Sequence, residues 1–182
     1  MKAARLFPYF SACLLLALAA KPSKAQQPIP NPLAAACGST EANFTVKRDT
    51  GSSTPAQVPP GKALVYIIES MQNYPFVTKK VNIGLDGAWF GATDANTHVS
   101  FTVDPGVHHL CAVYQGHAES MDNEGHTLLL RLNTQAGHIY YVRYHALFLK
   151  DSPGIAFFEP IDEDEGQYLV QSTEEATSTL KK

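Results

Sequence analysis

Short apolar runs separated by turn-forming residues are the feature that most constrains the fold of this chain. Residues 63–69 (ALVYIIE), 107–114 (VHHLCAVY) and 139–149 (IYYVRYHALFL) are rich in the β-branched and aromatic residues that favour strands. The run at 63–69 is continuous, as in a central strand buried on both faces. Between the runs the sequence shows turn signals and short β-prone stretches but no helical pattern of useful length, whereas a parallel α/β sheet needs crossover helices. The pattern therefore predicts an all-β fold, a small antiparallel β-sandwich.

Turn signals suggest how these strands connect. Asp86-Gly87 lies between two short β-prone runs and is a strong signal for a hairpin with a type I′ turn. The residues at 104–106 (DPG) also form a turn signal. We expect the strands on either side, 99–103 and 107–114, to pair with each other.

The sequence predicts four regions along the chain. The last of them begins with acidic residues, which suit the first turn of a helix near 162–170. The regions are a signal peptide (1–25), an extended Pro-rich segment and linker with one possible short strand at 43–47 (26–58), the β-sandwich domain (59–160), and a short acidic helix with a flexible tail (161–182).

The N-terminal region has the features of a secretory signal. Basic residues precede the apolar stretch at 14–20, and small residues mark a cleavage site between Ala25 and Gln26. A retained N-terminal anchor is the alternative, but the apolar run is shorter than the ~20 residues of a membrane helix. Lipidation is not expected, because Cys13 precedes the most apolar stretch. We expect an exported protein that is periplasmic, secreted or attached to the envelope, with no transmembrane segment after cleavage.

Charge argues against one class of partner. Removing residues 1–25 takes away four basic and no acidic residues, which shifts the formal net charge from −3 to −7. Much of this charge lies in the acidic C-terminal region. Nucleic-acid binding needs a basic surface, so no nucleic-acid partner is expected.

Two cysteines remain after cleavage, Cys37 and Cys111. In an oxidising compartment such a pair most simply forms a disulfide. The bond would close a loop of roughly 75 residues, for which the chain-entropy model gives about 4 kcal/mol of stabilisation. Two buried, unpaired thiols are the alternative.

The loop at 117–126 carries the most metal-like cluster of the sequence. His117, Glu119 and His126 are residue types that bind zinc or copper. A polar, solvated loop is the alternative, and we favour it. No cofactor is expected, and no catalytic residues are assigned.

Aromatic residues near the first hairpin are candidates for ligand binding. Tyr74, Phe76 and Trp89 lie in or beside its loops, where exposed rings can stack on sugars or anchor a partner. The alternative is that Trp89 helps to close the core.

Four motifs, taken in order, resemble a bacterial exported family known as domain of unknown function 2846, and more distantly PEGA-type surface modules. The resemblance covers about residues 59–148. Its motifs are Pro60-Gly61-Lys62-Ala63, Val81-x-Ile83-x-Leu85-Asp86-Gly87, Val103-x-Pro105-Gly106-x-His108-x-Leu110 and Ala136-Gly137-x-x-Tyr140-Tyr141-Val142-Arg143.

The resemblance implies a small sandwich of the immunoglobulin-like or PEGA-like type, often on lipoproteins or secreted proteins, with no established activity. The cysteine pair and the tail after Lys150 depart from the shorter family pattern. We therefore expect an exported non-catalytic module, a binding or structural protein of the bacterial cell envelope whose partner is an envelope protein or glycan. The alternatives are a metal-binding protein or metal-dependent enzyme using the 117–126 loop, and a carbohydrate-binding module.

Overall fold

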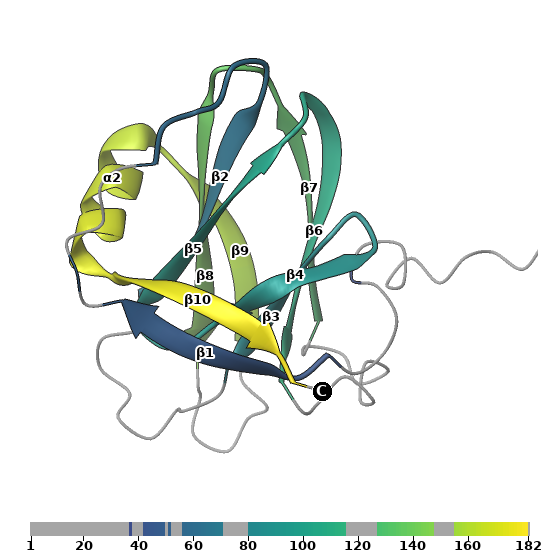
Figure 1. The fold of residues 1–182 in the computed structure, drawn as a ribbon, viewed down its shortest axis with the longest axis vertical. Helices are drawn as coiled ribbons and strands as arrows, with labels where there is room; N and C mark the ends of the chain where they lie inside the picture. The colour runs from purple at the N-terminus through teal and green to yellow at the C-terminus, as the bar shows by residue number, and fades with distance from the viewer. Residues whose placement is uncertain are drawn as a thin grey trace, which may run out of the picture.

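A computed structural model describes residues 37, 42–49, 51, 56–70, 80–115, 127–147 and 155–181. The described residues form ten strands and one helix, arranged as two facing sheets with the helix outside them (Figure 1). The six-stranded sheet has the order β1 (Phe44–Asp49), β10 (Glu174–Leu180), β5 (Thr97–Val103), β2 (Ala63–Glu69), β8 (Ile139–Leu147) and β9 (Ile155–Ile161). The four-stranded sheet has the order β4 (Ala88–Thr93), β3 (Val81–Leu85), β6 (Gly106–Tyr114) and β7 (Thr127–Thr134).

The main core lies between the two sheets. Alternate residues of each strand point inward, so that Val65 and Ile67 of β2 meet Ile83 of β3 and Leu110 of β6, all fully buried. This alternation is the expected result of the two-residue period of a strand. The predicted all-β sandwich with a short C-terminal helix is confirmed.

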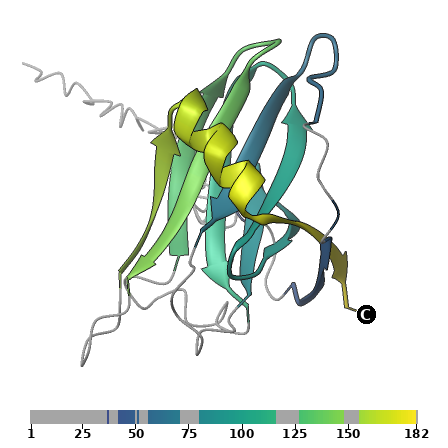
Figure 2. The ribbon, with the colours of Figure 1, turned by 90° about the vertical axis from the view of Figure 1, so that its left-hand side faces the viewer.

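A second, smaller core lies on the outer face of the six-stranded sheet. The helix α2 (Glu163–Ser172) crosses this face (Figure 2) and buries Leu169 against Leu64, Ile68 and Tyr141. The strand β2 is therefore buried on both faces, as its continuous apolar run predicts. In the part of the chain that the structure describes, no helix has the length and apolar character needed to cross a bilayer.

The helix begins where its sequence favours a start. The Asp162 side chain accepts a hydrogen bond from Glu165 N at 2.9 Å and so caps the first turn. Gly166 packs against the ring of Tyr141, which an added Cβ would overlap. The predicted helix near 162–170 thus agrees with α2 to within two residues.

The hairpin predicted at Asp86-Gly87 is confirmed. It joins β3 to β4, and both turn residues have positive φ, 48° and 84°, as a type I′ turn requires. The register shifts between Ile83 and Gly84.

The hairpin expected around residues 104–106 is wrong. Strand β5 pairs with β2, whereas β6 pairs with β3 and β7. The turn therefore carries the chain from one sheet to the other. Two strand pairs, β2 with β8 and β5 with β10, are parallel. Between β2 and β8 the chain forms β3, β4, β6 and β7 of the second sheet and β5 of the first, so strands link this parallel pair where an α-helix commonly does.

The flexible tail expected after the helix is also wrong, and the sandwich extends beyond 59–160. Residues Glu174–Leu180 form β10, which pairs along its length with β1 and at its start with β5. Ala176 of β10 is buried in the main core. The short strand expected at 43–47 overlaps β1, which belongs to the sheet. The pairing of β1 with β10 could not be predicted from the sequence of either segment, because it depends on a partner distant in the chain.

Candidate functional site

Cys37 and Cys111 form the predicted disulfide, with their Cα atoms 5.4 Å apart and both residues fully buried. Cys111 lies on β6, on the outer face of the four-stranded sheet. The bond therefore fastens the N-terminal part of the chain to a sheet in which that part has no strand.

The four-stranded sheet has a glycine, Gly84, where the disulfide packs against it. Gly84 pairs with Cys111 across β3 and β6. A Cβ at position 84 would lie 2.8 Å from Cys37 Cα and 3.0 Å from Cys111 Sγ, so glycine leaves the room that the disulfide needs. Beside it, the buried Asn82 side chain donates a hydrogen bond to Ala42 O at 2.5 Å. The outer face of β3 thus holds the N-terminal segment at two points.

Trp89 packs onto this same region. Its half-buried side chain lies against the disulfide and against Ala42, Phe44 and Ala92. The other ligand-binding candidates, Tyr74 and Phe76, lie outside the described residues. The contacts of Trp89 give it a packing role over the disulfide.

The metal candidates His117, Glu119 and His126 also lie outside the described residues. Within the ranges that the structure describes, no group of three or more His, Cys, Asp or Glu side chains is arranged to hold a metal ion.

His108 and Asp86 form a histidine–carboxylate pair, an arrangement that catalytic sites also use. His108 Nδ1 lies 2.6 Å from Asp86 Oδ2, and Nε2 lies 2.7 Å from Asp104 O. Partial burial acts to lower the pKa of His108, but the bonds to these two residues outweigh it and raise the pKa. Partial burial acts to raise the pKa of Asp86, yet the bonds from His108 and His109 N lower it. Both ring nitrogens of His108 are hydrogen-bonded, one to Asp86 in the β3–β4 hairpin turn and the other to Asp104 in the β5–β6 connection. The side chain therefore links these two turns.

Glu69 is the most unusual acid of the described chain. It ends β2 in phase with the inward-facing Val65 and Ile67, so its side chain enters the main core, where only 2% of the residue is exposed. Thr93 Oγ1 donates a hydrogen bond to Glu69 Oε2 at 2.8 Å. This contact joins the ends of β2 and β4 across the two sheets.

Burial disfavours the charged carboxylate and raises the pKa of Glu69 to about 7. The negative charge of Asp94 acts in the same direction, whereas the Thr93 hydrogen bond and the charge of Arg48 oppose it. Burial also raises the pKa of Tyr144, a core residue that hydrogen-bonds to Tyr114. This end of the core can therefore bind and release a proton near neutral pH, but its acid is too buried to meet a substrate.

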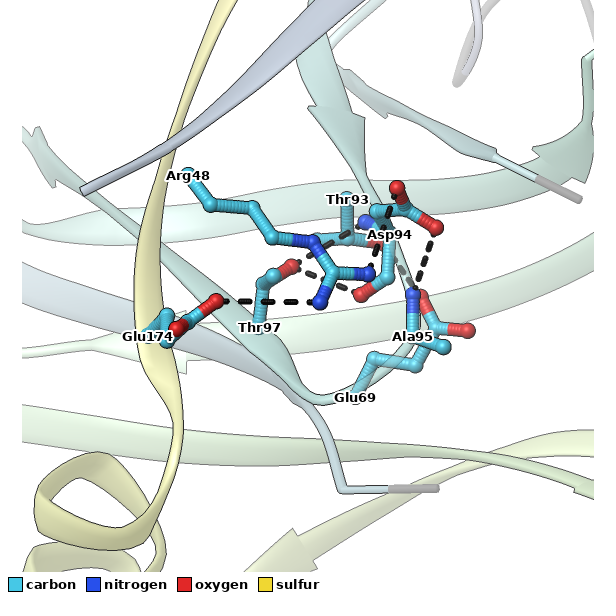
Figure 3. A network of polar contacts seen from close by, with 7 residues as sticks. All are labelled: Arg48, Glu69, Thr93, Asp94, Ala95, Thr97 and Glu174. Atoms are coloured by element: carbon cyan, nitrogen blue, oxygen red, sulfur yellow. Dashed lines mark hydrogen bonds and ion pairs between the residues drawn. The ribbon is translucent and has the colours of Figure 1, made fainter. Parts of the chain in front are cut away.

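Around Glu69, a polar network joins the first and last strands to the sandwich (Figure 3). Arg48 of β1 lies between Asp94 and Glu174, with nitrogen–oxygen distances of 3.4 and 3.6 Å. Thr97 Oγ1 accepts from Asp94 N at 3.0 Å and donates to Asp94 O at 2.7 Å, which holds the β4–β5 turn. Ion pairs at such partly exposed positions contribute about 0–1 kcal/mol each, so their main effect is positional.

A small pocket lies between α2 and the outer face of the six-stranded sheet. Its volume is about 200 Å³, and its walls come from β2, β8, α2 and Ala56. Tyr66 and Tyr141 stack in its floor, with ring centroids 5.4 Å apart and planes 9° from parallel. Gln167 and Gln171 contribute amide groups from the helix.

Neither Glu69 nor this pocket was found from the sequence. The position of Glu69 could have been predicted, because an acid in phase with the inward residues of a strand must enter the core. No sequence pattern indicates the pocket, since it depends on where α2 docks on the sheet.

Comparisons with models of protein families, with curated proteins and with solved structures found no match. The resemblance to domain of unknown function 2846 therefore stays a prediction.

Proposed function

We propose that this protein is an exported module of the bacterial cell envelope that acts by binding or as a structural part. The observation that carries the proposal is the buried Cys37–Cys111 disulfide. Structural disulfides persist in oxidising compartments and are rare in the cytosol. The signal-like segment at 1–25 supports the same location independently.

A binding or structural role also agrees with how the reactive groups are used. Both ring nitrogens of His108 are hydrogen-bonded, and His98 is buried with its Nδ1 2.9 Å from Thr173 Oγ1. Glu69 is enclosed by the core. These groups hold strands and turns together, and a substrate would have to displace those contacts.

Mass spectrometry of the mature protein tests the proposal. The full chain would be expressed in a bacterium and recovered from periplasm and medium. We expect a mature N-terminus at Gln26 and two cysteines that, in denaturant, react with an alkylating reagent after reduction but not before it. A Leu15→Arg variant, which interrupts the apolar stretch of the signal, should remain in the cytoplasm as the precursor. Retention of Met1, or free thiols in the recovered protein, would overturn the proposal.

A further inference from the structure

The pocket beneath α2 has a lining of mixed character. Tyr66 and Tyr141 are buried and stack on each other, so they offer the pocket ring edges and hydroxyls, while Ile139 and Val170 add aliphatic surface. Ile139 is 36% exposed, so it lies at the rim rather than in the closed core. Every described residue of the lining is uncharged, which favours a neutral ligand over an ion, because an ion loses hydration without gaining a charged partner.

Hydrogen-bonding groups of both kinds face the same space. The Tyr66 hydroxyl accepts from Ala56 N at 3.2 Å and can still donate its own hydrogen. The exposed Gln171 amide offers a donor and an acceptor from the helix. Gln167 is anchored by its bond from Nε2 to Glu163 Oε1 at 2.9 Å, which holds its amide in place.

We propose that this pocket binds one neutral hexopyranose unit of a glycan. A pyranose ring has an apolar C–H surface that suits the aliphatic side chains and tyrosine ring edges of the lining, and hydroxyls that both donate and accept, as the amides and the Tyr66 hydroxyl do. The volume of about 200 Å³ is smaller than the 300–1,000 Å³ usual for drug-sized ligands, so it fits a single ring. The inference rests on the proposed binding role in the envelope, and names the ligand class and site for it.

Titration of the oxidised full-length mature protein, followed by two-dimensional amide NMR, tests this assignment. The probes are the methyl glycosides of glucose and N-acetylglucosamine, with glucuronate as a charged comparison and cyclohexanol as an apolar one. We expect at least one neutral glycoside to give saturable shifts at the amides of Ala56, Gln167 and Gln171. Binding should be stronger than that of either comparison compound.

Two variants locate the site. Gln171→Ala removes one hydrogen-bonding group and should weaken glycoside binding about fivefold, the effect of one ordinary hydrogen bond. Ile139→Trp fills the rim and should abolish binding. Gln135→Ala is the matched control, because Gln135 is also exposed but lies in the β7–β8 turn outside the pocket; its affinity should equal that of the unchanged protein.

The inference is overturned if neither glycoside gives saturable shifts, if the shifts map away from the pocket, or if glucuronate or cyclohexanol binds equally well. Its failure is distinct from failure of the proposed function. If the protein is exported and disulfide-bonded but binds neither glycoside, only the sugar assignment fails. Free thiols and a retained signal would remove the export proposal whatever the titration shows.

Discussion

Glu69 places a carboxyl group where the other inward residues of β2 are apolar. Its pKa is raised to about 7 because the core disfavours the charged form. The folded protein therefore holds this proton more tightly than the unfolded chain does. The stability that this proton contributes is fully present below about pH 4.5 and is lost as the pH rises through about 7. The shift corresponds to roughly 3 kcal/mol at most.

Glu69→Gln should remove this dependence, because the amide resembles the protonated acid and can still accept the Thr93 hydrogen bond. Between pH 4.5 and 8.5, the variant should gain about 3 kcal/mol of unfolding free energy relative to the unchanged protein. Urea denaturation at several pH values measures the difference. Glu163→Gln, which changes an exposed carboxylate, is the control. Parallel pH profiles for Glu69→Gln and the unchanged protein would contradict the prediction.

Gly84 is constrained by close packing against the disulfide. A side chain there would meet Cys37 backbone atoms and the Cys111 sulfur, not the movable end of a flexible chain. Gly84→Ala should therefore cost about 1–3 kcal/mol, as overpacking of a well-filled site does. Gly51→Ala, at an exposed position, should stay within about 0.5 kcal/mol of the unchanged protein. Thermal unfolding of oxidised samples compares them, and equal losses would refute the close-packing argument.

At the scale of elements, the sequence predicted strands better than it predicted their partners. The two-residue alternation and the Asp86-Gly87 turn depend on local chemistry, so they could be read directly. The turn at 104–106 has the same chemistry in a hairpin and in a connection between sheets. Choosing between them requires knowing which strands already flank β5, and these are β2 and β10, which are distant in sequence.

The strand β10 shows the same limit more sharply. Its sequence, EEATSTL, is polar and buries little more than Ala176. What holds it is pairing with β1, in six matched positions from Phe44↔Leu180 to Asp49↔Glu175, together with the Ser178 hydroxyl that accepts from Ala92 N at 3.1 Å. Backbone pairing leaves almost no trace in side-chain pattern, which is why the segment resembled a loose tail.

A chain ending at Thr173 should release β1 as well as removing β10. In the full-length protein, the β1 amides bonded to β10 should exchange slowly with deuterium, and in the truncated chain they should exchange like a loop. The free energy of unfolding should fall by about 2 kcal/mol or more, the scale of a few net backbone hydrogen bonds. A chain ending at Lys181 is the control. Fast exchange of β1 in the full-length protein would show that the β1–β10 pair does not persist in solution.

Across the whole molecule, the chain closes on itself in two ways. The first and last strands, β1 and β10, pair with each other, and Arg48 links both to the β4–β5 turn. The Cys37–Cys111 bond spans 74 positions and encloses β1 through most of β6, strands that belong to both sheets. Breaking that bond should therefore affect the entire cooperative unit rather than one edge.

The double variant Cys37→Ala with Cys111→Ala should lose up to about 4 kcal/mol, because the unfolded chain regains the conformations that the loop of roughly 75 residues forbids. The same mechanism predicts a steeper dependence of unfolding free energy on urea, since an unfolded chain without the crosslink exposes more surface. Reduced protein should match the variant in both respects. If instead the variant lost stability with an unchanged slope, the bond would act mainly through folded-state packing under Trp89. If the variant were as stable as the oxidised protein, the disulfide would form in an oxidising compartment without stabilising the fold.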